Sequence, residues 1–325
     1  MADSIEAVAE FHNRLSAAMA PVLVGQEQAI EHVIIAIACG GHVLLTGGAA
    51  SGKGLLVRAL AKAAQLDFRR IQFTPDLMPS DITGSEILEE SAATGHRVKR
   101  FVPGPIFTNL LMADEINRTP PKTQSALLEG MQEKQVTAGG RTMPLPVPFF
   151  VMATRTSIET EGIYPLPEAQ QDRFMFNVEM RPLSQDEEHQ IVMNDPAAKL
   201  DRIEPVVDKE QIVSVQRLVR DVAVPEAVQR YIVDLTCASR PGTPDAGEMV
   251  NRYVAWGAGV RASQYLALGA KARAAMRGRS AAAVEDVKAV ALPVMRHRIG
   301  LNFRAENDGI TAARVVNTLV ETVKN

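Results

Sequence analysis

The sequence predicts an α/β fold: a parallel sheet covered by helices, followed by a second, all-helical domain. Three observations lead to this prediction. Short apolar segments alternate with segments of helical spacing through the first half of the chain, the alternation stops after Arg181, and a glycine-rich turn joins the first apolar segment to a helical one. Strands that alternate with helices are typical of parallel sheets, because each helix crosses from one strand to the next.

Five segments are predicted to form the sheet, because each is short and either apolar or alternating. They are residues 42–46, 68–74, 109–114, 149–154 and 174–180. Helices are expected after Lys53 and after Asn117, the second opened by prolines that suit a first helical turn. Residues 78–100 are polar and turn-rich where a plain helix would be expected, which indicates an insertion.

A domain boundary is expected where the alternation stops. It divides the chain into an α/β core with an N-terminal helix (1–182) and a helical domain (183–325). The residues from Ser184 to Glu187 have the pattern of a capping box, which opens a run of helices. Beyond them, apolar residues recur at the three- to four-residue spacing of a buried helix face.

Composition limits the classes of protein that fit. The chain has 325 residues, 46% of them hydrophobic, and a formal net charge of −3. This indicates a globular protein with no overall electrostatic attraction to nucleic acid or anionic lipid. No apolar run approaches the ~20 residues needed to cross a bilayer, and the first residues are acidic and polar, unlike a secretory signal. Cys39 and Cys237 lack metal-ligand spacing. We therefore expect a cytoplasmic protein that has no membrane insertion and does not bind nucleic acid.

A glycine-rich segment follows the first predicted strand. It matches the phosphate-binding pattern G-x-x-x-x-G-K-[ST] except at the last position, where glycine replaces the hydroxyl residue. In such loops backbone N–H groups and the helix N-terminus face phosphate oxygens, and the lysine adds positive charge. Taken alone, the segment could also be a flexible turn. The candidate nucleotide-binding residues are Gly47, Gly48, Ala49, Ala50, Ser51, Gly52, Lys53, Gly54 and Leu55.

Two acidic residues end the third predicted strand. An apolar run is followed directly by Asp114 and Glu115, and ligands of open α/β sheets bind at the carboxyl ends of the strands. Asp114 is the candidate Mg²⁺ ligand, through water, and Glu115 is the candidate catalytic residue that polarises the attacking water. The alternative is a solvated acidic turn without chemistry.

The longer sequence around these residues resembles the MoxR family of AAA+ ATPases. The resemblance rests on LLMADEINR followed by PPKTQSALLEGMQE, and on FTPDLMPSDITG, PGPIF and EGIYPLPEAQQDRF. It is dense from Val24 to Phe176 and thins across the helical domain, where WGAGVRAS (256–263) is the main matching segment. The family implies an AAA+ P-loop NTPase domain with a five-stranded parallel sheet, followed by a helical lid. It also implies ATP and Mg²⁺ bound between subunits of a homo-oligomeric, usually hexameric, ring.

The resemblance implies roles for three further residues. Arg173, in QDRF, matches the arginine finger that reaches into the neighbouring subunit's site, and Arg261 matches the lid residue that contacts the γ-phosphate. Thr156, the third candidate catalytic residue, stands where the family usually has an asparagine that orients the attacking water. Without the family, Arg173 would be interpreted as a surface ion pair and Arg261 as a snorkelling helix residue.

Gly54 and Thr156 depart from the family pattern at positions that serve cleavage more than binding. Losing one polar ligand costs about 1–3 kcal/mol, and each ~1.4 kcal/mol at the transition state is tenfold in rate. We therefore expect hydrolysis slowed roughly tens- to thousands-fold. The retained Lys53, acidic pair and arginines argue against loss of nucleotide binding.

The leading hypothesis is an ATP hydrolase that acts as a chaperone and uses ATP binding and slow hydrolysis to remodel, mature or activate a client protein. The family implies a partner with a von Willebrand factor A domain. Residues 78–100 and 134–147 are expected to project toward the face and channel of the ring and to couple nucleotide state to the partner. The alternative is a ring that binds nucleotide without hydrolysing it, as a scaffold or regulatory subunit. A third hypothesis, a nucleic-acid motor, is disfavoured by the acidic charge balance.

Overall fold

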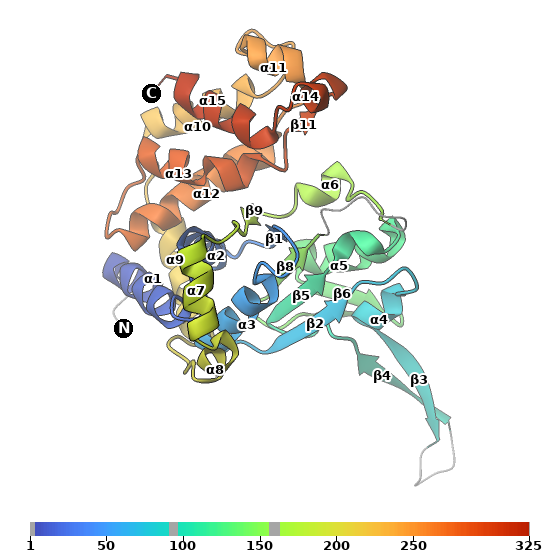
Figure 1. Cartoon of the computed structure of the whole chain (residues 1–325). Helices are drawn as coiled ribbons and strands as arrows, with labels where there is room; N and C mark the ends of the chain where they lie inside the picture. Colours follow the sequence, from blue (N-terminus) through green and yellow to red (C-terminus); the bar gives the residue numbers. More distant parts are fainter. Residues whose placement is uncertain (1–3, 91–96, 156–162, 325) are drawn as a thin grey trace.

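The computed structural model describes residues 4–90, 97–155 and 163–324, and its centre is a parallel five-stranded sheet (Figure 1). The strand order is β2-β5-β8-β1-β9, and every neighbouring pair is parallel. The five predicted segments contain the five observed strands, so this part of the prediction is confirmed. The strands are β1 (Val43–Thr46), β2 (Phe68–Gln72), β5 (Leu110–Asp114), β8 (Phe150–Thr154) and β9 (Phe176–Glu179).

The sheet is buried on both faces because the central strands are apolar at consecutive positions. In β1, Val43 and Leu45 join the larger hydrophobic cluster, whereas Leu44 points to the other face and joins the smaller one. Three helices cover the first face and contribute buried side chains to the larger cluster. They are α1 (Ile5–Met19), α2 (Glu27–Cys39) and α3 (Lys53–Ala63).

The second face is covered by α5 (Pro121–Glu133), which follows the short 3₁₀ helix η1 (Ile116–Arg118). After α5 come β6 (Gln135–Ala138) and β7 (Arg141–Pro144), an antiparallel hairpin. Gly139 and Gly140 join these strands with φ of 58° and 72°. Two successive residues in the left-handed region make the tight turn that twisted hairpins favour, so glycine is needed there.

The described residues between 78 and 100 do not form a plain helix, as expected. They include the short helix α4 (Pro79–Thr83) and the strand β3 (Gly84–Glu90), which pairs antiparallel with β4 (Arg97–Pro103). Figure 1 shows this hairpin projecting away from the body of the protein.

The chain from Gln185 onward is mainly helical, as predicted, and the capping box forms: Ser184 Oγ accepts from the Glu187 N–H, and Glu187 Oε2 accepts from the Ser184 N–H. The prediction of an all-helical domain needs one correction, because β10 (Val254–Trp256) and β11 (Gly300–Leu301) pair there. The helices are α7 (Gln185–Met193), α8 (Pro196–Asp201), α9 (Lys209–Asp221), α10 (Glu226–Ala238), α11 (Glu248–Tyr253), α12 (Val260–Met276), α13 (Val284–Met295), α14 (Phe303–Asn307) and α15 (Ala312–Thr322).

One hydrophobic cluster joins the sheet to the helical region. Buried side chains of α9, α12 and α13 belong to the same cluster as those of α1, α2 and the first face of the sheet. In Figure 1, α8 lies beside α3, and the helices from α10 to α15 sit above the sheet. No helix within the described ranges is long and apolar enough to cross a bilayer.

Candidate active site

The glycine-rich segment forms the loop between β1 and α3. Its backbone has φ of 135° at Gly47, 58° at Ala50 and 88° at Gly52, which is the N-cap of α3. A Cβ at Gly47 would lie 2.6 Å from the Met180 carbonyl oxygen, so only glycine fits there. The loop therefore wraps around the N-terminus of α3, where free N–H groups favour an anion.

Lys53 lies at the centre of this loop. Its Nζ donates to the carbonyl oxygens of Gly47 (3.0 Å) and Gly48 (2.7 Å) and to Ser51 Oγ (3.2 Å). Loss of hydration on burial lowers the pKa of Lys53, and the negative charges of Asp114 and Glu115 oppose this shift. A cavity of about 450 Å³ adjoins the loop, and its lining includes the lysine, the N-terminus of α3 and Asp114.

Gly54 is the residue that lacks the expected hydroxyl. A Cβ at this position would meet only Met112 Cε, at 3.7 Å, which is ordinary van der Waals contact with the end of a flexible side chain. Space therefore does not demand glycine here, because the structure accommodates a Cβ at this position.

The acidic pair lies at the carboxyl end of β5, beside the loop. Asp114 Oδ1 accepts from Thr154 Oγ1 (2.5 Å), and Oδ2 accepts from Arg70 Nε (3.1 Å). The same Thr154 oxygen accepts from the backbone N–H of Glu115 (2.8 Å). Glu115 has a left-handed backbone with φ of 56°, an unfavourable conformation for a residue with a Cβ. The buried threonine thus fixes both acids.

The carboxylate of Glu115 is held from the edge strand. Its Oε2 accepts from Gln72 Nε2 (2.8 Å) and from Arg118 Nη1 (3.0 Å). Gln72 in turn accepts from Arg70 Nη2 (2.8 Å). Sequence reasoning did not find Thr154, Arg70 or Gln72. The only available signal was the place of Thr154 at the end of a predicted strand and that of Arg70 and Gln72 within another.

These residues fit a nucleoside triphosphate with Mg²⁺. Among the described residues no heavy atom lies within 4 Å of the position of a Gly48 Cβ, so an anion can approach the loop backbone closely. Lys53 supplies a cation, and Asp114 is the oxygen ligand that would hold Mg²⁺. Water would complete the coordination, because Gly54 offers no hydroxyl and Mg²⁺ usually keeps several waters.

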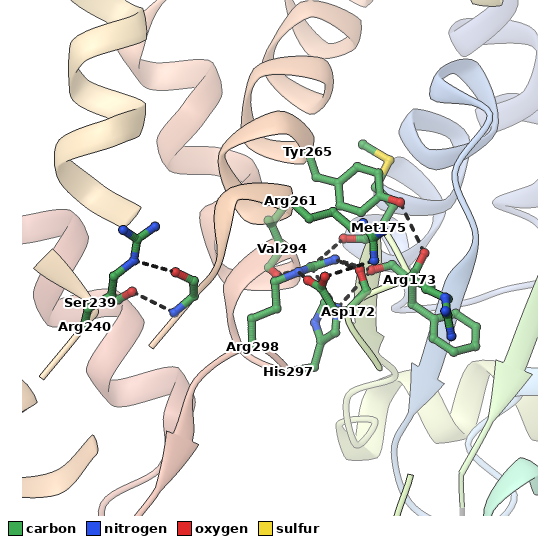
Figure 2. A network of polar contacts seen from close by, with 12 residues as sticks. Asp172, Arg173, Met175, Ser239, Arg240, Arg261, Tyr265, Val294, His297 and Arg298 are labelled. Atoms are coloured by element: carbon green, nitrogen blue, oxygen red, sulfur yellow. Dashed lines mark hydrogen bonds and ion pairs between the residues drawn. The ribbon is translucent and has the colours of Figure 1, made fainter. Parts of the chain in front are cut away.

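The two predicted arginines lie close to Asp172 (Figure 2). They are at the other end of β9 from the phosphate loop. Arg261 Nη1 donates to Asp172 Oδ2 (3.0 Å), and Asp172 comes just before Arg173 in the chain. Because β9 runs parallel to β1, residues that precede β9 lie opposite the end from which the loop leaves β1.

Arg298 ties this region to the lid. Its Nε donates to Asp172 Oδ1 (2.8 Å), and its Nη2 donates to the carbonyl oxygens of Asp172 and Phe174 (2.6 and 2.7 Å). Burial lowers the pKa of Arg298, and Asp172 opposes the shift. In contrast, the Arg173 guanidinium makes no hydrogen bond or ion pair to any described residue, and its Nε is buried without a partner. Arg173 is therefore a cation that the described part of its own chain leaves without a partner.

Thr156 lies outside the described residues, so the structure gives no position for this candidate.

Comparisons with known proteins agree with this geometry. Residues 42–176 match the model of the "ATPase family associated with various cellular activities (AAA)", and residues 247–319 match that of the "AAA lid domain". A crystal structure of a candidate ATPase from Cytophaga hutchinsonii superposes with a TM-score of 0.87 at 39% sequence identity, covering 98% of this chain and 97% of that one.

Several curated relatives extend over nearly the whole chain. Chaperone MoxR1 of Mycobacterium tuberculosis is 40% identical over 306 residues, which is 93% of this chain and 79% of the relative. YeaC of Bacillus subtilis, whose function is uncharacterised, is 40% identical over 93% of this chain and 91% of the relative. Protein MoxR of Methylorubrum extorquens is 30% identical over 99% of this chain and 95% of the relative. Together with the two matching domain models and the phosphate loop beside its acidic pair, these relatives show that the chain belongs to the MoxR family of AAA ATPases.

Proposed function

We propose that this protein binds ATP with Mg²⁺ at the loop of residues 47–54, hydrolyses it slowly, and uses the cycle as a chaperone to remodel, mature or activate a client protein. The observation that carries this proposal is the juxtaposition of Lys53 with Asp114 and Glu115. Three charged groups of the kinds that phosphoryl transfer needs meet at the edge of the sheet where the strands have their carboxyl ends.

Each residue has a defined task in this proposal. The loop N–H groups and Lys53 neutralise phosphate oxygens, and Asp114 holds the metal. Glu115 orients the attacking water and accepts its proton, because its carboxylate is positioned by Gln72 and Arg118. Bound Mg²⁺ supplies charge neutralisation at the transferred phosphoryl group.

Arg173 and Arg261 serve a different chain in this proposal. Both lie at the end of β9 opposite their own loop, so the site that they reach is that of a neighbouring subunit in a homo-oligomeric ring, which we propose to be a hexamer. The uncommitted guanidinium of Arg173 is suited to stabilise transition-state charge there. Asp172 holds Arg261 beside it.

The chaperone role rests on the family and on the name of one relative, Chaperone MoxR1. We propose a client protein and a partner with a von Willebrand factor A domain, in the cytoplasm. The projecting β3–β4 hairpin and the β6–β7 hairpin are the surfaces that would couple nucleotide state to them. If a chain with β6–β7 replaced by a short Gly-Ser turn still remodels a client at the normal rate, this role of the hairpin is wrong.

A second candidate function is a ring that holds nucleotide as a scaffold or regulatory subunit without hydrolysing it. Gly54 is the observation that favours it, because the position has room for a Cβ and yet the chain supplies no hydroxyl residue there.

Steady-state ATP hydrolysis with Mg²⁺, measured where fluorescent-nucleotide binding is confirmed, separates the two candidates. Turnover by the unmodified chain that is abolished in Glu115→Gln supports the ATPase. Bound ATP with no turnover above that control supports the scaffold. Gly54→Thr should raise turnover roughly tenfold or more by restoring one polar ligand. Gly54→Ala is the matched control, because it adds the Cβ and helix propensity but no hydroxyl.

A further inference from the structure

A second cavity reaches the phosphate loop from the β9 side. Its volume is about 500 Å³, and it lies between the sheet and the lid. The loop contributes its first residues to the lining, Gly47 and Gly48, with Thr46 before them. The other walls come from the ends of β8 and β9 and from the lid: Arg155, Asn177, Glu179, Arg296, Thr311, Ala312 and Ala313.

The charges in this cavity are unbalanced. Arg296, the C-cap residue of α13, donates from Nη1 to Glu179 Oε2 at 2.7 Å. Its side chain is only 14% exposed, whereas that of Glu179 is 55% exposed. Arg155, on the β8 side, makes no hydrogen bond or ion pair within the described part of the chain. The described lining therefore holds two guanidinium groups and one carboxylate next to Gly47 and Gly48, which gives it excess positive charge beside the loop.

We propose that Arg296 is a phosphate-binding residue that the lid contributes to the site of its own chain. It exchanges its partner Glu179 for the terminal phosphate of a nucleoside triphosphate bound at the loop. This inference rests on the proposed function, because it needs a triphosphate at residues 47–54. A diphosphate lacks the terminal phosphate, so it competes less well with Glu179 for the guanidinium.

The position of Arg296 in the chain connects this exchange of partners to Arg173 and Arg261. Arg298, two residues further on, is bonded to Asp172, and Asp172 holds Arg261. Movement at the end of α13 is thus passed along β9 from the loop to the side of the subunit where Arg173 and Arg261 lie. The nucleotide bound in one site would then change the positions of Arg173 and Arg261, which reach the site of the next subunit.

A purely structural ion pair makes a different prediction. If Arg296 and Glu179 serve only to hold α13 against β9, then removing either side chain weakens the same contact. Both variants would change nucleotide affinity in the same direction, and would do so equally for diphosphate and triphosphate. The exchange that we propose requires opposite effects, because Glu179 competes with the nucleotide whereas Arg296 binds it.

The experiment measures affinities of the full chain for fluorescent ATP and ADP with Mg²⁺, and needs no turnover. Arg296→Gln should weaken ATP binding about tenfold or more, the loss of one charge-assisted hydrogen bond, and ADP binding much less. Glu179→Gln, which keeps the side-chain shape, should tighten ATP binding a few-fold. Arg230→Gln is the matched control: this exposed arginine on α10 pairs only with Glu226, four residues away.

Equal losses for ATP and ADP in Arg296→Gln, or weaker ATP binding in Glu179→Gln, would overturn the inference. If the arginine variant does not fold, the sign of the Glu179→Gln effect decides alone. Lys53→Ala separates this failure from failure of the proposed function. ATP binding that is lost in Lys53→Ala but unchanged in both cavity variants overturns only the role of Arg296. ATP binding that is absent, or insensitive to Lys53→Ala, overturns both.

Discussion

Thr154 is the residue on which both acids of the site depend. Its hydroxyl donates to Asp114 and accepts from the N–H of Glu115, so one buried oxygen spans the neighbouring strands β5 and β8. Without it, Asp114 loses a donor and the Glu115 N–H loses its acceptor at a backbone position with positive φ.

We predict that Thr154→Val lowers the free energy of unfolding by about 1–3 kcal/mol, because it leaves a buried polar group unpaired. It should also lower turnover at least tenfold, roughly the effect of misplacing one catalytic group. Valine has the shape of threonine, so packing is preserved. Thr154→Ser keeps the hydroxyl and is the control. Urea denaturation and ATP turnover measure the two effects, and equal behaviour of the valine and serine variants would contradict the prediction.

At this scale the sequence predicted only residues that stand next to one another in a motif. Lys53 follows the glycines, and Asp114 and Glu115 end one strand, so their grouping is visible in the chain. Gln72 and Thr154 reach the acids only because β2 and β8 flank β5, with Gln72 in register with Asp114. The sequence around a polar residue at the end of a strand does not indicate which residues of other strands lie beside it.

Among the elements, the strands of the central sheet were predictable, whereas β3, β4, β10 and β11 were not. The inner strands β5, β8 and β1 are runs of apolar residues buried on both faces, and burial of this kind leaves a strong pattern. β10 and β11 have three and two residues, too few for any periodicity. The β3–β4 hairpin is exposed, so its polar residues indicated an insertion but not its conformation.

His42 links three elements in a way that fixes its protonation state. Its Nδ1 accepts from the Val151 N–H of β8 (3.0 Å), so its Nε2 carries the proton and donates to the Met131 carbonyl of α5 (3.0 Å). The ring is buried, and burial lowers its pKa to about 4. His32 is also buried, and its pKa is likewise lowered to about 4.

We predict that acidification destabilises the protein between pH 6.5 and 4. The folded-state pKa of each histidine lies below the unfolded value, so the unfolded chain binds more protons in this range and stability falls with pH. At pH 5 each such histidine lowers the free energy of unfolding by about 2 kcal/mol relative to pH 7.5. Urea denaturation at both pH values measures this. His42→Gln should be less stable at pH 7.5 yet show a smaller pH dependence. An unchanged slope would contradict the assignment.

Asp286 stabilises the start of α13. Its carboxylate is fully buried and accepts from Arg273 (2.8 Å), Arg279 (2.6 Å) and the Ala283 N–H (2.9 Å). Burial raises the pKa of Asp286, but these hydrogen bonds outweigh it and the pKa is lowered.

We predict that Asp286→Asn lowers the free energy of unfolding by about 2–4 kcal/mol, because it leaves Arg273 without its buried counter-charge. Glu226→Gln is the matched control: it removes an exposed acid from the first turn of α10, and exposed pairs contribute about 0–1 kcal/mol. Urea denaturation of both variants measures the loss in free energy of unfolding. Equal losses would show that burial of the Asp286–Arg273 pair does not add to its effect on stability.

At the scale of the whole molecule, the arrangement of the lid relative to the sheet could not be predicted from the sequence. The apolar stripes of α9 and α12 predicted that one face of each helix is buried. Such a stripe does not indicate which other element covers that face. The structure packs these helices on α1 and α2 in one continuous core. The same packing brings Arg261 and Arg298 to Asp172, which precedes Arg173 in the chain, and so places Arg261 away from its own loop.

This placement makes a prediction about the assembled protein. If Arg173 completes the site of a neighbour, Lys53→Ala and Arg173→Ala chains should each be inactive alone, whereas a mixture should regain activity. Some interfaces then pair an intact loop with an intact arginine, about a quarter of them in a randomly mixed ring. ATP turnover is measured after subunit exchange, in the Gly54→Thr background if the natural chain is silent. Lys53→Ala mixed with Glu115→Gln is the control: both residues serve their own chain's site, so no mixed interface is complete and no activity should return. If the Lys53 and Arg173 mixture recovers no activity, Arg173 serves the site of its own chain, against the geometry of β9. Recovery in the control would contradict the assignment of Lys53 and Glu115 to one site.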